Sequence, residues 1–194
     1  NILTIFLMIK IAVFASGNGT NAENIIKYFK NHLKLKIKLI ASNKKDSNVF
    51  KRASKHNTQT FFFSPKELYN GYVLKELKKC EIDFIVLAGF LLKIPKKLII
   101  AYPKKIINIH PSLLPLYGGK GMYGIHVHKK VFDAKDTETG ITIHFVNEKY
   151  DDGTIIFQAK CRLNKYDTIQ GIAKKVHKLE KKFFPKIIES ILNE

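Results

Sequence analysis

The sequence feature that most constrains the fold is a regular alternation between short apolar runs and segments with helical periodicity. Apolar runs of strand length stand at Met8–Ala15, Leu35–Ala41, Gln59–Phe63, Asp83–Ala88 and Lys105–Ile109. Strands that alternate with helices of about 10–15 residues predict βαβ units, in which the strands run parallel. We therefore expect an α/β fold with a doubly wound, mostly parallel sheet of the Rossmann-like kind.

Helical periodicity fills the segments between these runs. It covers Asn24–Leu33 and Asn48–His56. A further helix is expected after Ser64, because Ser64 and Glu67 have the spacing of a capping box and Pro65 suits the first helical position. We expect this helix to continue without a break to about Cys80.

The last third of the chain has a different pattern. Two segments, Gly140–Asn147 and Gly153–Lys160, flank a short turn and predict an antiparallel hairpin at the far edge of the sheet. Asp167–Leu192 then has the apolar spacing of a long amphipathic helix that closes the fold. With no linker or repeat in between, we expect one domain over residues 8–194. Residues 1–7 are expected to be an apolar extension without a function, since they lack the features of a secretory signal and are too short to span a bilayer.

The chain carries a large positive charge, because 34 Lys and Arg against 16 Asp and Glu give +18. Only Arg52 and Arg162 are Arg, and all the other basic residues are Lys. Surfaces that read bases or clamp phosphates usually use the bidentate fork of Arg. We therefore attribute the charge mainly to compositional drift and expect no nucleic-acid partner. Two cysteines, Cys80 and Cys161, are too few to staple the domain and suit a reduced, cytoplasmic protein.

A glycine-rich loop, Ser16–Asn21 (SGNGTN), follows the first apolar run and leads into the first expected helix. Glycines allow the backbone to turn tightly and approach a ligand, and a helix N-terminus offers unpaired N–H groups to a phosphate. The lysine of a P-loop and the three-glycine dinucleotide fingerprint are absent. The loop is therefore either a phosphate site or a plain strand-to-helix turn capped by Thr20 or Asn21.

Asn108 and His110 lie at the carboxyl end of an expected core strand, where ligands bind in open α/β sheets. Because they are two residues apart on an extended chain, their side chains project to the same side. An amide donor beside an imidazole can hold a carbonyl oxygen and stabilise a charge that develops on it. The alternative is a histidine whose ring is hydrogen-bonded to a nearby backbone group.

Asp151 and Asp152 lie in the turn expected between the two strands of the hairpin. Asp-Gly is a common hairpin turn, so the pair Asp152-Gly153 has an ordinary structural explanation. A carboxylate at this edge of the sheet can instead keep a histidine protonated and accept a proton from a nucleophile. Both interpretations stay open on these residues alone.

Other polar residues give weaker signals. His126, His128 and His144 do not form a ligand set with a persuasive metal spacing, so we expect no metal site. Glu180 lies in the closing helix among lysines, a setting that is typical of a solvated, ion-paired residue.

Taken together, these segments resemble the glycinamide ribonucleotide formyltransferase family, folate-dependent enzymes of purine synthesis. The similarity is carried, in the family's order, by Ser16–Asn21 (SGNGTN), Val86–Phe90 (VLAGF), Ile107–Pro115 (INIHPSLLP), Gly140–Val146 (GITIHFV) and Asp151–Gly153. It covers Met8 to about Leu192. The resemblance implies transfer of a formyl group from 10-formyltetrahydrofolate, as co-substrate, to the amine of glycinamide ribonucleotide, with no metal.

The resemblance also implies roles for the polar residues, because Asn108, His110 and Asp151 match the family's catalytic trio. His110, as an imidazolium, would stabilise the oxyanion and protonate the leaving folate nitrogen, while Asn108 would bind the formyl oxygen. Asp151 would keep His110 protonated and relay the proton that leaves the amine. Asp152 stands where a glycine is usual, and we assign the catalytic carboxylate to Asp151.

Substrate-binding positions of the family also have counterparts in this sequence. The ribonucleotide would contact Gly19, Thr20, Asn21 and Glu180. The folate would contact Lys66, Leu91, Leu92, Lys93, Ile94 and Asn108. In the folate segment Leu92 replaces a common arginine, with Lys93 beside it.

Related activities are the alternatives. We do not expect methionyl-tRNA formyltransferase or formyltetrahydrofolate deformylase, because each carries an extra domain for which 194 residues leave no room. An amino-sugar formyltransferase would be expected to lack the glycine-rich loop, and a basic nucleic-acid-binding module is the alternative from another class. The expected partners are the two small-molecule substrates, with no membrane partner, for a monomer or homodimer in the cytoplasm.

Overall fold

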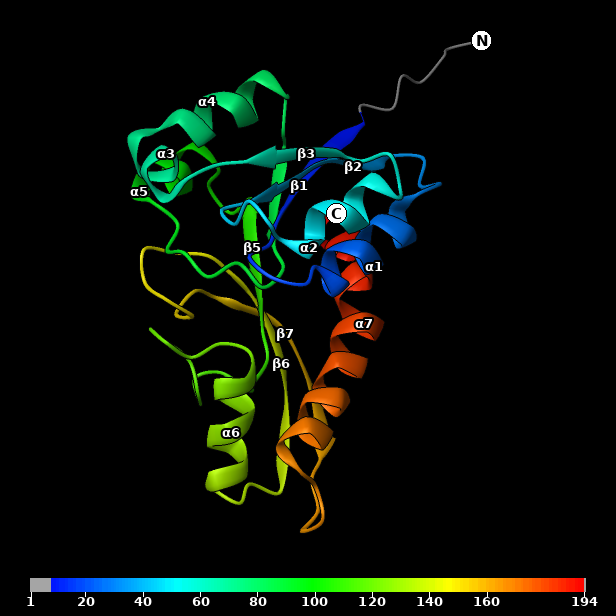
Figure 1. Cartoon of the computed structure of the whole chain (residues 1–194), viewed down its shortest axis with the longest axis vertical. Helices are drawn as coiled ribbons and strands as arrows, with labels where there is room; N and C mark the ends of the chain where they lie inside the picture. Colours follow the sequence, from blue (N-terminus) through cyan, green and yellow to red (C-terminus); the bar gives the residue numbers. More distant parts are fainter. Residues whose placement is uncertain (1–7, 194) are drawn as a thin grey trace.

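A seven-stranded sheet runs through the molecule and organises its helices (Figure 1). The computed structural model describes residues 8–193, so the expectation for residues 1–7 lies outside the described residues. The strands are β1 (Ile9–Phe14), β2 (Leu35–Ser42), β3 (Gln59–Phe62), β4 (Phe84–Leu87), β5 (Ile106–His110), β6 (Glu138–Phe145) and β7 (Ile155–Arg162). The helices are α1 (Thr20–Phe29), α2 (Asn48–Ser54), α3 (Pro65–Asn70), α4 (Tyr72–Lys79), α5 (Lys96–Ala101), α6 (Ile125–Asp133) and α7 (Ile169–Asn193).

Neighbouring strands follow the order β3-β2-β1-β4-β5-β6-β7. The first five of these strands pair in parallel, whereas β6 pairs antiparallel with both β5 and β7. The predicted doubly wound, mostly parallel sheet with an antiparallel C-terminal hairpin is therefore confirmed. The central strand β4 is buried along its whole length, as a continuous apolar run predicts for a parallel strand covered on both faces.

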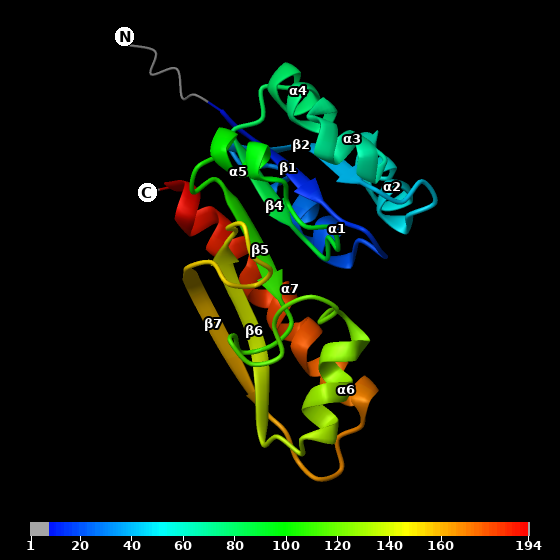
Figure 2. The same cartoon turned by 90° about the vertical axis from the view of Figure 1, so that its left-hand side faces the viewer.

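Helices cover both faces of the sheet, as the side view in Figure 2 shows. On one face, residues of α1, α2, α6 and α7 form an apolar cluster that includes Phe184. On the other face, residues of α3, α4 and α5 form a second cluster that includes Leu77. Successive residues of β1 serve opposite faces, since Val13 belongs to the first cluster and Phe14 to the second.

The expectation of one helix from residue 65 to about Cys80 is wrong, because the chain turns at Gly71. Gly71 has a φ of 97°, a left-handed conformation that glycine adopts freely, and it separates α3 from α4. The predicted capping box at the start of α3 is confirmed. Ser64 N donates to Glu67 Oε2 at 2.7 Å, and Glu67 N donates to Ser64 Oγ at 3.3 Å.

The hairpin of β6 and β7 depends on close backbone approach at two glycines. A Cβ atom on Gly140 would lie 2.0 Å from the carbonyl oxygen of Ala159, and one on Gly153 would lie 1.7 Å from that of Phe145. The predicted closing helix is α7, which is 25 residues long and packs against α1, α6 and both hairpin strands (Figure 2). No helix within residues 8–193 is long and apolar enough to cross a membrane.

Thr142 of β6 ties the hairpin to the loop that follows β5. Its side chain is fully buried, and Oγ1 donates to the Ser112 carbonyl oxygen at 2.7 Å. Thr142 Oγ1 in turn accepts hydrogen bonds from Leu114 N and Gln158 Nε2, each at 2.9 Å. This hydroxyl therefore fixes the path of the chain directly after His110.

Replacing Thr142 by Val removes the hydroxyl and keeps the shape of the side chain. The Leu114 N–H then loses its buried acceptor, so we expect the free energy of unfolding to fall by about 2–3 kcal/mol. Urea denaturation measures this loss. Thr137→Val is the matched control, because Thr137 is exposed, and an equal loss in both variants would contradict the role given to Thr142.

Candidate functional site

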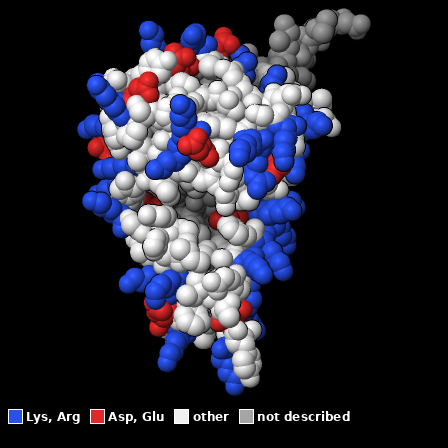
Figure 3. Space-filling view, viewed as in Figure 1, with Lys and Arg blue, Asp and Glu red and all other residues white. Residues whose placement is uncertain are grey.

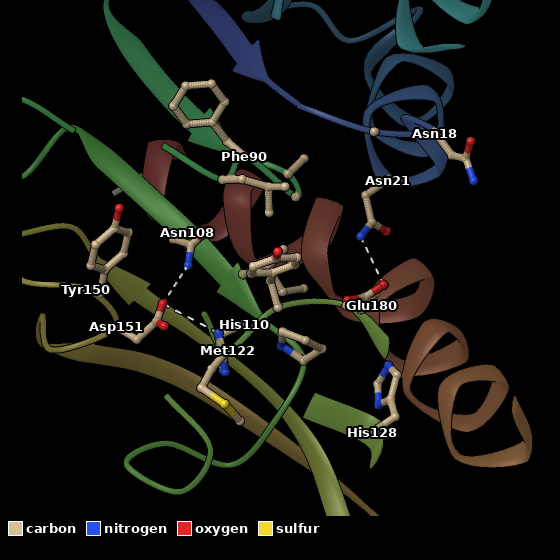
Figure 4. A pocket seen from close by; sticks show the side chains of 18 of the residues that line it. Asn18, Asn21, Phe90, Asn108, His110, Met122, His128, Tyr150, Asp151 and Glu180 are labelled. Atoms are coloured by element: carbon tan, nitrogen blue, oxygen red, sulfur yellow. Dashed lines mark hydrogen bonds and ion pairs between the residues drawn. The ribbon is translucent and has the colours of Figure 1, made fainter. Parts of the chain in front are cut away.

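The carboxyl ends of β1, β4 and β5 meet at one edge of the sheet, and a cavity of about 650 Å³ lies beyond them. Ligands of open α/β sheets bind at such a position. The face in Figure 3 is hollowed near its middle, and Figure 4 shows the side chains inside. Side chains of α6, of α7 and of the turn after β6 contribute to the lining. The rest of the lining comes from four chain segments: Gly17–Asn21, Ala88–Leu91, Asn108–Pro111 and Gly119–Gly124.

The glycine-rich loop forms one wall of this cavity. Gly19 has a φ of 71°, and a Cβ atom there would lie 2.5 Å from Val49 Cγ2, so both its conformation and its packing require glycine. α1 begins at Thr20 rather than at Asn24, the first residue of the expected helix. The earlier start brings the helix N-terminus directly behind the loop, which suits an anionic ligand.

Asn108, His110 and Asp151 come together at the opposite wall (Figure 4). Asn108 and His110 are on β5, and Asp151 is in the turn between β6 and β7. Asp151 Oδ1 lies 3.4 Å from both Asn108 Nδ2 and His110 Nδ1. Its other oxygen accepts a hydrogen bond from Gly119 N at 2.9 Å. The neighbouring Asp152 points elsewhere, since its carboxylate accepts from Asn147 Nδ2 at 3.0 Å.

Both ring nitrogens of His110 face hydrogen-bond acceptors. Its Nε2 lies 2.8 Å from the carbonyl oxygen of Tyr117, which can only accept a hydrogen bond. Its Nδ1 faces the carboxylate of Asp151, which is also an acceptor when ionised. The His110 ring is therefore held at the cavity wall between a backbone carbonyl and a carboxylate.

Asp151 is ionised in this arrangement. Burial of the carboxyl group opposes ionisation, but the interactions with His110, with His144 at 3.7 Å and with the Gly119 N–H outweigh it and hold the pKa of Asp151 far below its usual range. Its side chain is only 11% exposed. A buried carboxylate beside a buried imidazole is an arrangement typical of acid–base sites.

Asn108 is oriented from behind by His144. Asn108 Nδ2 lies 3.1 Å from His144 Nε2, and the two residues face each other across the β5–β6 pairing. His144 Nδ1 lies 2.8 Å from the Phe145 carbonyl oxygen, so this nitrogen donates and Nε2 is left to accept from the amide. The Asn108 side chain is therefore fixed with its N–H groups toward His144 and Asp151.

Glu180 lies inside the cavity and is not a solvated residue of the helix surface. It is 5% exposed, and its Oε2 accepts from Asn21 Nδ2 at 3.0 Å and contacts His177 Nδ1 at 2.7 Å (Figure 4). The hydrogen bond to Glu180 raises the pKa of His177. A carboxylate from α7 and an amide from α1 thus stand together near the glycine-rich loop.

A smaller cavity of about 50 Å³ adjoins the first. Leu92, Lys93 and Ile94 line it, whereas Leu91 lines the large cavity. The residues that line both cavities are Phe90, Asn108, Tyr150 and Asp151. Asn108 and Asp151 therefore lie at the junction of the two cavities.

Lys66 is the one residue of the expected folate set that the structure places away from both cavities. It lies in the first turn of α3, where its side chain is exposed and Leu68 supplies the buried contact. The physical reason is that α3 points Leu68 into the core, which turns Lys66 toward solvent.

Comparison with known proteins agrees with this geometry, since residues 9–188 match the family described as formyl transferase. The chain belongs to the formyl transferase family. It is 37% identical over 191 residues to the phosphoribosylglycinamide formyltransferase of Bacillus subtilis, with 95% of each chain covered. It is 39% identical over 192 residues to the chloroplastic enzyme of that name from Arabidopsis thaliana, and it spans 66% of that protein's length.

Solved structures also resemble this formyl transferase. The phosphoribosylglycinamide formyltransferase of Bacillus halodurans superposes with a TM-score of 0.87 at 34% identity, over 95% of this chain and 96% of that one. Glycinamide ribonucleotide transformylase 1 of Geobacillus kaustophilus gives a TM-score of 0.87 at 35% identity, over 95% and 99% of the two chains. The protein is therefore a formyl transferase enzyme, and the family uses a folate-derived formyl donor.

Several lining residues of this formyl transferase were not expected to line the site. His177 precedes Glu180 by three residues, so helical spacing alone could have placed it on the same face. Helical spacing could not have identified Phe90, Met122 and Tyr150, because loops bring these residues to the cavity. His128 was noted only as a metal candidate; it is 3% exposed, burial lowers its pKa, and its Nδ1 has no hydrogen-bond partner within residues 8–193.

The large cavity has few basic residues in its lining. Lys120 is the one Lys or Arg among the described residues that line it. The abundant lysines therefore lie mainly on the outer surface, as Figure 3 shows for one face. Within residues 8–193, no three His, Cys, Asp or Glu side chains are grouped so that they could hold a metal ion.

The low pKa of Asp151 predicts a pH dependence of stability. An unfolded aspartate has a pKa of about 3.9, so the unfolded state binds protons first as the pH falls. The stability that ionised Asp151 contributes is complete above about pH 5 and is lost as the pH falls toward its folded pKa. Urea denaturation between pH 6 and pH 3 should therefore show the wild type losing stability relative to Asp151→Asn.

The control for this measurement is Asp152→Asn, whose carboxylate is 50% exposed and does not contact His110. Its unfolding free energy should run parallel to that of the wild type over the same range. A wild-type advantage over Asp151→Asn that does not change with pH contradicts the proposed charge pair.

Proposed function

We propose that this formyl transferase moves the formyl group of 10-formyltetrahydrofolate to the amine of glycinamide ribonucleotide. The products are formylglycinamide ribonucleotide and tetrahydrofolate, a step of de novo purine biosynthesis. The observation that carries the proposal is the position of Asn108, His110 and Asp151 at the junction of two cavities, one of which has a glycine-rich wall. Its relatives in Bacillus subtilis and Arabidopsis thaliana are phosphoribosylglycinamide formyltransferases, which supports the same reaction.

The ribonucleotide fits the large cavity in this proposal. Its phosphate would accept hydrogen bonds from the backbone N–H groups of the glycine-rich loop at Asn18, Gly19 and Thr20, because the N-terminus of α1 favours an anion. Asn21 and Glu180 lie next along the same wall and offer an amide and a carboxylate to the hydroxyl and amine groups of the substrate. The amine then extends toward Asn108 and His110.

In this proposal the folate would reach Asn108 from the side of the smaller cavity, which at about 50 Å³ admits only part of the molecule. Leu92, Lys93 and Ile94 line the smaller cavity, and Leu91 stands at the larger one. The apolar walls suit a flat ring, while the backbone and Lys93 offer polar contacts. The formyl group would then lie at Asn108, within reach of both cavities. Lys66 lines neither cavity, so its contact with the folate stays a prediction.

The chemistry follows from these positions. The amine nitrogen attacks the formyl carbon. The negative charge on the formyl oxygen is stabilised by the His110 imidazolium and by the Asn108 N–H that faces Asp151 at 3.4 Å, which would turn toward the substrate. A carbon–nitrogen bond to the acceptor forms, and the bond from the formyl carbon to the folate nitrogen breaks. His110 donates the proton of Nδ1 to the leaving folate nitrogen, because Nε2 is held by the Tyr117 carbonyl, and the proton from the amine returns by way of Asp151 to the same Nδ1. Atoms and charge balance over the cycle.

Other acceptors are less well matched. An amino-sugar acceptor without a phosphate would leave the glycine-rich wall without a ligand. A nucleic acid needs a stripe of cations, whereas Lys120 alone supplies a lysine to the large cavity among its described lining. We place the reaction in the cytoplasm, because Cys80 and Cys161 are both free thiols. The enzyme is proposed to act as a monomer or homodimer.

The direct test mixes the purified protein with both substrates and follows the absorbance of the folate. Turnover is expected with glycinamide ribonucleotide and not with an amino sugar of similar size. A folded protein that gives no turnover above background with glycinamide ribonucleotide would contradict the proposed function.

Single substitutions test the assignment of roles. His110→Ala and Asp151→Asn should each lower kcat by at least about a hundredfold, the lower part of the range for acid–base groups. Asp152→Asn makes the same chemical change one residue away and should keep kcat within about threefold of the wild type, because its carboxylate is half exposed. If Asp152→Asn loses activity and Asp151→Asn does not, the carboxylate has been assigned to the wrong residue.

A further inference from the structure

The outer side of the glycine-rich loop is held by side chains from α2 and its N-cap. The carbonyl oxygen of Gly17 accepts a hydrogen bond from Ser47 Oγ at 2.7 Å. The carbonyl oxygen of Asn18 accepts one from Arg52 Nε at 2.8 Å, and the Asn18 side chain accepts one from Asn48 Nδ2 at 3.2 Å. Two consecutive backbone carbonyls of the loop are thus fixed toward α2.

This orientation decides where the loop's N–H groups point. In a planar trans peptide the carbonyl of one residue and the N–H of the next point in opposite directions. The Gly17 carbonyl therefore fixes the Asn18 N–H, and the Asn18 carbonyl fixes the Gly19 N–H, each away from α2. Gly17, Asn18 and Gly19 all line the large cavity, and neither of these N–H groups donates a hydrogen bond within residues 8–193.

Arg52 also joins the loop to the helix behind it. Its Nη1 makes an ion pair with Glu23 in the first turn of α1. Glu23 also contacts Lys27 at 3.2 Å and His56 at 3.4 Å. Burial opposes the ionisation of Glu23, but the hydrogen bond from Arg52, with those from His56 and Lys27, lowers its pKa to about 2. One guanidinium therefore bonds both a loop carbonyl and a helix carboxylate.

We propose that Arg52, assisted by Ser47, is a positioning residue that aims the Asn18 and Gly19 N–H groups at the phosphate of the acceptor substrate. The inference rests on the proposed function and adds to it a specificity device outside the cavity. Arg52 itself lines neither cavity, and its charge is offset by Glu23, so it acts through geometry rather than as a phosphate ligand. The rigid fork of Arg reaches both partners, which the single ammonium of Lys cannot do.

Steady-state kinetics of Arg52→Lys, Arg52→Gln and Ser47→Ala test the proposal. The KM for glycinamide ribonucleotide should rise by about tenfold or more in both Arg52 variants, since two donors to a charged group lose their alignment. The KM for 10-formyltetrahydrofolate and kcat should stay within about threefold of the wild type. We expect the Arg52→Lys variant to keep the raised KM, because Lys has the charge of Arg but not its planar group of several donors. Ser47→Ala should show the same split with a smaller rise.

Arg162→Gln is the matched control. Arg162 is the other arginine of the chain, lies exposed on β7, and should leave both KM values unchanged. Isothermal titration with inorganic phosphate gives a second readout, with weaker binding expected in the Arg52 variants alone. If Arg52→Gln does not fold, Arg52→Lys and Ser47→Ala make the same test.

Two outcomes overturn the inference. The first is an unchanged KM for glycinamide ribonucleotide in the Arg52 variants. The second is an equal rise in the KM values for both substrates, which indicates general structural damage. Both outcomes require a wild type that turns over its substrates. A wild type without turnover contradicts the proposed function instead, and the inference falls with it.

Discussion

The carboxylate of Asp151 lies between the imidazole of His110 and the amide of Asn108, and the rest of the site is arranged around this contact. The two partners come from a parallel strand, whereas Asp151 comes from the turn of the antiparallel hairpin. Because a buried charge is costly unless it is paired and hydrogen-bonded, the hairpin must hold the turn closely in place. The glycines at 140 and 153 allow the required backbone approach, and Thr142 fixes the loop that follows His110.

The fold separates binding from chemistry. Parallel strands deliver Asn108 and His110 to the edge of the sheet, while the glycine-rich loop and Leu92–Ile94 reach that edge from different connections. Formyl transfer needs an amine and a formyl carbon to meet where an oxyanion can be stabilised. In the proposed reaction, a site at the junction of two cavities meets this need with the His110 ring and the Asn108 amide.

Local patterns in the sequence were enough to predict the sheet, the capping box at Ser64 and the closing helix. They failed at Gly71, because glycine is compatible with both a helix interior and a left-handed break, and tertiary packing chose the break. Motifs identified Asn108, His110 and Asp151, but not the Tyr117 carbonyl that fixes the His110 ring. Such partners depend on contacts between distant segments, which periodicity does not encode.

In the proposed reaction, two substrates enter from different sides and meet at Asn108 and His110. The most direct measurement is a crystal structure of the protein with glycinamide ribonucleotide and an unreactive analogue of 10-formyltetrahydrofolate. We predict the phosphate on the N–H groups of Asn18 and Gly19, the folate ring against Leu92–Ile94, and the amine within about 3.5 Å of the formyl position. A phosphate bound away from the glycine-rich loop, or a folate ring bound away from Leu92–Ile94, would contradict the account.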